Sequence, residues 1–124
     1  MPPSQANPSA LPVISAGHAR RVLLNRQQLG HNPGGRINRL NLMETIRALG
    51  FVQVDSVNTV ARAHHMILFA RHQGYRPRML DQLLEKDRHL FENWTHDASV
   101  IPSEFYPYWR QKFQRLAPRL KERW

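Results

Sequence analysis

The fold of this chain is decided by the stretch Phe51-Val52-Gln53-Val54-Asp55-Ser56-Val57-Asn58, in the middle of its 124 residues. Polar and apolar residues alternate there with a period of two, which predicts a half-buried β-strand. The first two valines are expected on one face, and Gln53 and Asp55 on the other. Their Cα atoms would lie about 7 Å apart, so a carboxamide and a carboxylate are aimed at one place.

Two interpretations of this Gln-x-Asp pair are open. An edge strand of a half-buried sheet commonly shows two polar residues to solvent. Alternatively, the Asp55 carboxylate orients or deprotonates a water molecule, while the Gln53 carboxamide holds that water or the substrate. Alternation by itself does not decide between a solvated edge and a catalytic pair.

The N-terminal half of the sequence predicts two helices. Ser15 can cap the first, which runs to about residue 28. Asn41, followed by Glu44, resembles a capping box and predicts a second helix over 42–49. Gly50 then ends that helix at the C′ position. The expected apolar side of the first helix consists of Ala19, Val22, Leu23 and Leu29.

The C-terminal half predicts three more helices. Thr59 can cap one that runs to about residue 71, whose second half, 66–70, is apolar all round and therefore expected to be buried. Pro77 near a first turn begins the next, with Met79, Leu80, Leu83 and Leu84 inward. The segment 89–102 is aromatic-rich and is expected to be irregular. Ser103 can cap the last helix, with Phe105, Trp109, Lys112, Phe113 and Leu116 along one side.

About five helices and one or two short strands indicate a mostly α-helical, α+β fold. Residues 1–14 are expected to form a disordered leader, because four of the nine prolines lie there together with Ser, Asn and Gln. Residues 15–124 are then a single domain. Its last residues lack a helix-capping signal, which predicts that the domain is truncated at its C-terminus.

The charge indicates a polyanionic partner. Eighteen Lys and Arg residues face nine Asp and Glu, for a net charge of +9, and all but Lys86, Lys112 and Lys121 are arginine. The planar guanidinium binds phosphates bidentately and stacks on bases. This balance favours nucleic acid over a basic surface that is merely solvated.

Composition also excludes several classes of protein. There is no cysteine, which excludes disulfides and thiolate metal sites and fits a reducing compartment. No apolar run is long enough to span a membrane, and the N-terminus lacks the features of a signal peptide. A cytoplasmic protein is expected. HExxH, phosphate-binding and G-x-S-x-G motifs are missing, so no metal and no cofactor is expected.

Three other groups are candidate contacts. The Gly/Pro/Asn-rich loop 30–39 carries Arg36 and Arg39, and it is either a phosphate contact or a soluble connector. The pair His64-His65 is expected to consist of core or surface histidines, with a phosphate contact as the alternative. The run 94–97 places Trp, His and Asp together, which fits either a packed Trp beside a His–Asp hydrogen bond or part of a site.

Three separated blocks resemble the AlkZ/YcaQ family of winged-helix DNA glycosylases. They are G-F-V-Q-V-D-S-V-N-T-V-A-R-A-H-H (Gly50–His65), Y-R-P-R-M-L-D-Q-L-L (Tyr75–Leu84) and F-E-N-W-T-H-D-A-S (Phe91–Ser99). The resemblance implies that the chain is the winged-helix-type N-terminal segment of a multi-domain protein. The family's catalytic motif falls on Gln53 and Asp55, in its Gln-x-Asp, YcaQ-like branch.

The resemblance implies hydrolysis of the N-glycosidic bond of N7-alkylated purines, including the unhooking of interstrand DNA crosslinks. No lysine lies near the motif, so a monofunctional glycosylase without a lyase step is expected. The partner would be double-stranded DNA with alkylated or crosslinked purines, bound by a monomer. DNA contacts are expected from the matching blocks and from the basic loop, at Arg62, His64, His65, His96, Arg36 and Arg39.

Two alternatives are kept beside this expectation. Family members are considerably longer, so the chain could be an inactive truncated remnant. It could also be a non-catalytic winged-helix DNA-binding protein, which needs a recognition helix rich in base-reading side chains. The apolar run 66–70 in the helix after the strand counts against that alternative.

Overall fold

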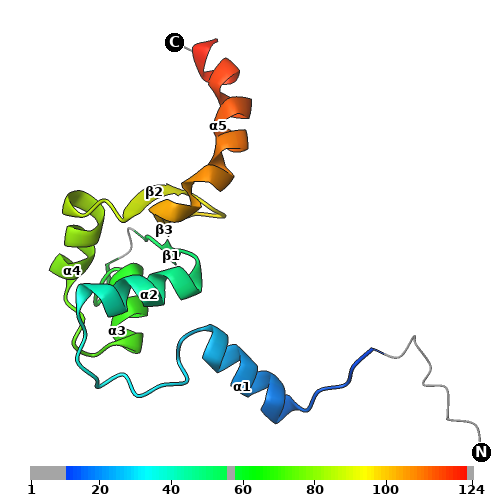
Figure 1. The fold of residues 1–124 in the computed structure, drawn as a ribbon, viewed down its shortest axis with the longest axis vertical. Coiled ribbons are helices and arrows are strands. Elements are labelled where there is room, and N and C mark those ends of the chain that lie inside the picture. The colour runs from blue at the N-terminus through cyan, green and yellow to red at the C-terminus, as the bar shows by residue number, and fades with distance from the viewer. Residues whose placement is uncertain (1–10, 56–57, 123–124) are drawn as a thin grey trace, which may run out of the picture.

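The computed structural model describes residues 11–55 and 58–122 (Figure 1). The predicted leader lies mostly outside these residues, as do Ser56 and Val57 of the central stretch. The described chain is α+β and winged-helix-like, as the sequence predicted. None of its helices is both long enough and apolar enough to cross a membrane.

Five α-helices and three short strands make up the described part of the chain. The helices are α1 (Ala16–Arg26), α2 (Arg39–Leu49), α3 (Ala63–Arg71), α4 (Pro77–Asp81) and α5 (Tyr106–Lys121). A π-helical turn, Gln82–Lys86, continues α4, and a 3-10 turn, Ser103–Phe105, leads into α5. The strands are β1 (Val52–Gln53), β2 (Leu90–Trp94) and β3 (Ala98–Pro102).

The order of these elements is that of a winged helix. β3 lies in the middle of the sheet, antiparallel to β1 on one side and to β2 on the other. The helices α3 and α4 follow β1 as a helix-turn-helix pair, and β2 and β3 form the hairpin known as the wing. The pairing of Gln53 with Ser99 places the candidate motif against the central strand.

The core lies between one face of the sheet and the helices α2, α3 and α4. Val52 and Val100, which pair with each other, are buried on that face. Leu42 and Ile46 of α2 and Leu68 of α3 are fully buried against them. At about 25 cal/mol per Å² of apolar surface, this shared burial is what holds the short strand β1 in place.

Several predicted signals are confirmed. The Ser15 side chain caps α1 by accepting from the backbone N–H of His18. Gly50 ends α2 at φ 85°, a conformation that only glycine adopts without strain. Pro77 begins α4, and the four residues predicted to point inward from it are buried or half-buried.

The predicted caps of α2 and α3 are wrong. The cap of α2 is Asn38, whose side chain accepts from the N–H of Asn41, so Asn41 itself lies inside the helix. Thr59 does not begin α3, which starts at Ala63 with Arg62 in the cap position and no side-chain cap bond. An isolated bridge between Asn58 and Arg62 closes a turn there, and this turn delays the helix.

The segment 89–102 is not irregular, because it forms the β2–β3 hairpin. Its alternation is weak, since β3 is buried at nearly every position. The turn between the strands lacks the Asn-Gly or Asp-Gly pair that usually marks a tight hairpin. The third strand was therefore missed, although Val100 and Ile101 are β-branched.

Predicted apolar faces of α1 and α3 remain partly exposed. α1 buries none of its residues, and its predicted apolar side, including Leu23, faces solvent. The prediction that 66–70 is buried is wrong for Met66, Phe69 and Ala70, which are exposed, the first two to 52% and 50%. The buried residues of α3 are 64, 68 and 71, at helical spacing, and Ile67 packs half-buried beside them, because the described chain covers just one side of that helix.

The last helix projects away from the body, as does α1 at the opposite end (Figure 1). Ser103 does not cap it. Ser103 lies in the preceding 3-10 turn, and its hydroxyl donates to the carbonyl of Arg88. The side predicted for α5 is the half-buried one. Phe91 of β2 packs edge-on against Tyr106 and Trp109, which anchors the first turns of α5 on the sheet.

Candidate active site

Gln53 is the last residue of β1, and its carboxamide is held by the loop of the wing. Its Nε2 donates to Oδ2 of Asp97 at 3.3 Å. Its Oε1 accepts from Nε2 of His96 at 3.2 Å. The His96 ring also packs edge-on against Phe51, with ring centroids 5.6 Å apart. Both ends of the amide are therefore fixed by two consecutive residues of one loop.

Asp55 lies two residues beyond Gln53, just outside the paired part of the strand. The observed strand is shorter than the predicted one, because β1 ends at Gln53. One further sheet hydrogen bond follows, from the N–H of Val54 to the carbonyl of Ala98. Asp55 is half-buried at the end of this ladder. The pair thus lies where the central strand turns into the wing loop.

A cavity of about 370 Å³ opens beside Gln53. It is mostly apolar, with Phe51, Leu49 and Ile67 on its walls and His96 at its edge. Val52, Gln27 at the end of α1 and Arg71 at the end of α3 also line it. A concave apolar site with a few convergent polar groups is typical of a ligand-binding pocket.

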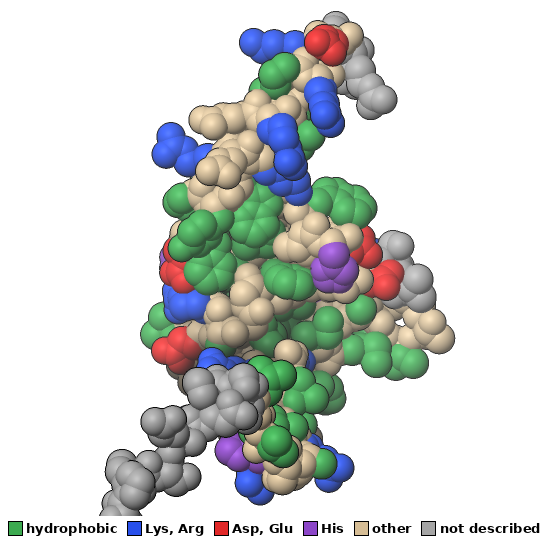
Figure 2. Space-filling view, turned by 90° about the vertical axis from the view of Figure 1, so that its right-hand side faces the viewer, with side chains coloured by type: hydrophobic (Ala, Val, Ile, Leu, Met, Phe, Trp, Pro, Cys, Tyr) green, Lys and Arg blue, Asp and Glu red, His purple; other side chains and the backbone are tan. Residues whose placement is uncertain are grey.

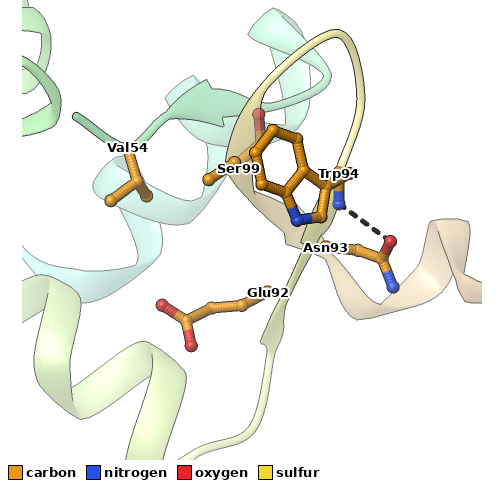
Figure 3. A pocket seen from close by; sticks show the side chains of 6 residues that line it. Val54, Glu92, Asn93, Trp94 and Ser99 are labelled. Atoms are coloured by element: carbon orange, nitrogen blue, oxygen red, sulfur yellow. Dashed lines mark hydrogen bonds between the residues drawn. The ribbon is translucent and has the colours of Figure 1, made fainter. Parts of the chain in front are cut away.

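A second hollow, of about 330 Å³, lies at the wing end of the sheet. Figure 3 shows Val54 and Glu92 pointing to the same side of the sheet, with Trp94 at the end of the hairpin. The indole of Trp94 is 60% exposed, although large aromatic side chains are usually well buried. Asn93 turns the other way and accepts from the backbone N–H of Trp94.

Arg71 is a buried cation that no pattern in the sequence marks. Only 7% of it is exposed, and its guanidinium donates to the carbonyls of Gln27 and Ile67, at 2.8 and 2.7 Å. Burial lowers the pKa of Arg71. Within residues 11–55 and 58–122, the ion pairs are Arg39–Asp87 and Arg47–Glu104, so Arg71 is compensated by carbonyls at two helix ends. It fastens α1 to α3 at the cavity wall.

Of the predicted DNA contacts, only His96 lies beside Gln53. Arg36 is exposed in its loop, and Arg62 is exposed at the start of α3. Arg39 is paired with Asp87 at 2.8 Å on the surface. None of these three arginines lines either hollow.

The two adjacent histidines of α3 differ in their surroundings. His64 is only 6% exposed, and its Nδ1 has no hydrogen-bond partner among the described residues. His65 is half-buried, with its Nδ1 2.9 Å from the hydroxyl of Tyr75. Burial lowers the pKa of both rings. Lowered pKa values favour neutral imidazoles, and a buried neutral ring is a poor partner for a phosphate.

The run Trp94–Asp97 was expected to contain a His–Asp hydrogen bond if it were simply a packed structural turn. Instead, both His96 and Asp97 bond to Gln53. Asp97 was therefore missed as a site residue, although it lies in one of the blocks that resemble the glycosylase family. No group of three His, Asp or Glu side chains in the described residues is close enough together to hold a metal ion.

Cations also gather on α5, as Figure 2 shows on the projecting helix. The helix contains no acidic residue, and its five cations are Arg110, Lys112, Arg115, Arg119 and Lys121. Lys112 donates to the carbonyl of Trp94 at 2.8 Å, which ties this basic helix to the wing.

The sequence pattern of one family matches most of the chain. The family is described as DNA glycosylase AlkZ-like, and the match covers residues 46–124. It includes the Gln-x-Asp motif, both histidines of α3 and the whole wing, whereas α1 and the loop with Arg36 and Arg39 lie outside it. No solved structure matches the chain.

Proposed function

The chain belongs to the AlkZ-like DNA glycosylase family, and we propose on this basis that it is a monofunctional glycosylase in which Gln53 and Asp55 carry the catalysis. The family makes DNA the partner. Its proposed substrates are N7-alkylated purines in duplex DNA, including those of interstrand crosslinks. The observation that supports this most is the Gln53 carboxamide, fixed at both ends beside a cavity and two residues from a carboxylate.

The chemistry of such substrates suits this pair. Alkylation at N7 leaves the purine positively charged, so the base is already a good leaving group and needs little protonation. The enzyme has to stabilise a sugar with oxocarbenium character and to position a water molecule. One carboxylate can do both, which is why the two carboxylates of ordinary glycosidases are not required.

In this proposal Asp55 provides the negative charge and accepts the proton of the attacking water. Gln53 holds that water without competing for its proton, because a carboxamide is neutral. The Gln53 amide has one N–H and one lone pair left after its bonds to the wing. Those two positions are the ones available to water or to the sugar.

DNA would approach the wing and the two hollows. We propose that His96 and the exposed indole of Trp94 lie nearest the lesion, and that Arg62, Arg36 and Arg39 bind phosphates. His65 is a further candidate contact, while His64 would contribute from beneath the surface by packing. The protein is proposed to act as a monomer without a metal or cofactor.

Base release from defined DNA tests the proposal. Duplexes with a single N7-methylguanine, a single N7-linked crosslink or no lesion are incubated with the chain, and abasic sites are counted after alkaline cleavage. We expect abasic product from both lesions, none from undamaged DNA, and no strand nicking before alkali. Absence of product from both lesions would contradict the proposal, and nicking without alkali would contradict a monofunctional reaction.

One observation favours a second function, a non-catalytic DNA-binding module. α3 and α4 form a helix-turn-helix pair, and Arg76 and Arg78 are exposed at the start of α4, the position of a recognition helix. Such a module would bind one duplex sequence selectively, and a double change of Gln53 and Asp55 to alanine would leave that binding intact. Selective binding without base release would favour this function over the first.

A further inference from the structure

We infer that the wing loop clamps the Gln53 carboxamide in a single orientation, and that Asp97 and His96 are positioning residues that act on the reaction through Gln53. The inference rests on the proposed function of Gln53. It adds a second carboxylate to the site, with a role different from that of Asp55.

The first step is that Asp97 is itself held rigidly. Its Oδ1 accepts from the N–H of Ala98 at 2.8 Å, which leaves Oδ2 for Gln53. Its backbone carbonyl accepts from the N–H of Thr95 at 3.0 Å and from the hydroxyl of Ser99 at 3.1 Å. The loop thus closes on itself around Asp97, so its free carboxylate oxygen has a fixed position relative to β3.

The second step is that this oxygen fixes the orientation of the amide. An ionised carboxylate can only accept hydrogen bonds, so the atom of Gln53 that faces Asp97 must be the NH₂ group. The reversed amide would place Oε1 against Oδ2 at about the same separation, so that two acceptors are in contact. Its NH₂ group would then face the N–H of His96, where it has no acceptor. The reversed state therefore loses hydrogen bonds and brings two acceptors together, which disfavours it.

The third step concerns His96, on the other side of the amide. Because Oε1 faces it, the ring must carry a proton on Nε2. Nδ1 lies 3.3 Å from the hydroxyl of Thr95, which can donate to it when the ring is neutral. The contact between the His96 ring and Phe51 limits its rotation. The chain of contacts from Thr95 through His96 to Gln53 therefore agrees with the orientation that Asp97 requires.

The consequence is a fixed geometry for the unused donor and acceptor of Gln53. A water molecule bound by the amide is positioned by two side chains that never touch it. Catalytic geometry is sensitive at this level, since a displacement of about 1 Å can cost about 10²-fold in rate. Loss of the Asp97 bond should lower kcat and leave KM nearly unchanged, because His96 and Trp94, on the wing surface that faces DNA, are kept.

The clamp can be observed without any activity, in the NMR signals of the Gln53 side-chain amide. In the wild-type chain we expect two well-separated Gln53 Hε2 signals, one with a nuclear Overhauser effect to the Asp97 side chain. The variant Asp97→Asn keeps the shape and the acceptor for Ala98 but removes the charge that forces the orientation. Its Gln53 signals should shift, and that Overhauser effect should weaken. Glu44→Gln, an equal charge change at an exposed position of α2, is the control and should leave them unchanged.

Kinetics provide the second arm. In multiple-turnover base release we expect Asp97→Asn to lower kcat by about 10- to 100-fold with KM within about twofold. His96→Asn, whose side chain is too short to reach Oε1, should lower kcat as well, while His89→Asn serves as its exposed control. Thermal unfolding of each variant confirms that it is folded, and either variant alone suffices for the test.

The outcomes separate the clamp from the function. A wild-type chain that releases no base contradicts the proposed function, whereas the NMR arm still tests the clamp. Gln53 signals that are unchanged in both Asp97→Asn and His96→Asn overturn the clamp. The inference is also overturned if the Gln53 signals shift in a variant whose kcat equals that of the wild type. In that case the contacts would hold the amide without affecting the reaction.

Discussion

At the scale of single residues, Gln53 differs from an exposed strand amide because residues of one loop hydrogen-bond to both terminal atoms of its side chain. Period-two alternation was enough to place it on a strand, opposite the buried Val52. Alternation could not indicate its partners, because His96 and Asp97 lie more than forty residues away in sequence. The same limit applies to Arg71, whose basic side chain on an amphipathic helix gives no sign that it is buried.

Gln53→Glu tests the electrostatics of this contact. The new carboxylate would face Asp97 Oδ2, 3.3 Å from the present Nε2, so the like charge should raise the pKa of the introduced carboxyl group above its ordinary value. A carboxyl group whose pKa is raised in the folded state stabilises below its unfolded pKa, and this stability is lost as the pH rises through the folded pKa. We therefore expect the Tm of this variant to approach the wild-type value near pH 4 and to fall below it toward pH 8, with a loss of about 1 kcal/mol in the free energy of unfolding. A constant difference in Tm across this range would contradict the contact.

The buried histidines predict acid sensitivity. Burial lowers the pKa of His72, helped by nearby His31 and Arg71, and burial likewise lowers the pKa of His64 and His65. For a histidine with a lowered pKa, the unfolded state binds more protons than the folded state between the two pKa values. The Tm should therefore fall as the pH is lowered from about 6.5, the ordinary value for histidine.

His72→Gln removes one of these groups and tests the prediction. The His72 Nε2 lies 2.7 Å from the hydroxyl of Thr45, and an amide can take its place without binding a proton. We expect a lower Tm at pH 8 but a shallower fall toward pH 5 than in the wild type. His89→Asn, at an exposed position, is the control, and an equally steep fall in His72→Gln would argue against the role of His72.

At the scale of elements, the predictions succeeded where one local signal decides and failed where distant contacts do. Ser15, Gly50 and Pro77 act on their own helices, and each does what was predicted. Asn38 and Asn41 are equally good caps by residue type. Packing of the additional turn, which follows Asn38, therefore has to decide between them. The wing was missed because β3 is buried nearly throughout and therefore does not alternate.

The attachment of α1 is predicted to depend on Arg71. The Nε of Arg71 donates to the carbonyl of Gln27, and the carbonyl of Arg71 lies 3.0 Å from Nε2 of His31. Arg71 therefore makes both of these contacts between α3 and the chain that follows α1. Arg71→Met should raise the rate of tryptic cleavage at Arg26 severalfold and lower the Tm, because α1 buries no side chain of its own. Arg78→Met, which removes an exposed arginine of α4, is the control. Equal cleavage rates in the two variants would contradict this account.

At the scale of the whole molecule, α1 and α5 extend from a small winged-helix body, and both helices carry cations and no acidic residue (Figures 1 and 2). Net charge and arginine content already indicated nucleic acid. The sequence could not show that α5 would carry five cations beyond the wing, tied to it by Lys112. Such placement depends on the aromatic contacts between Phe91 and the first turns of α5.

Charge on α5 is predicted to contribute to DNA binding. Changing Arg110, Arg115 and Arg119 together to glutamine should weaken duplex binding at low salt. It should also reduce the slope of log K against log salt by up to about 2.7, the value for three phosphate contacts. Arg47→Gln, which removes a cation that is already paired with Glu104, should change the slope by less. Titrations at several salt concentrations measure both, and an unchanged slope in the triple variant would exclude α5 from the interface.

The most direct test of the central claim is the single-turnover rate of N7-methylguanine release by the wild type, Asp55→Asn and Glu44→Gln. The asparagine keeps the shape of Asp55 but removes the charge and the proton acceptor. We predict that Asp55→Asn lowers the rate by at least about 10²-fold, the usual contribution of a general base, while Glu44→Gln stays within about twofold of the wild type. A wild-type rate in Asp55→Asn, with all three proteins equally folded, would contradict a catalytic Gln-x-Asp pair.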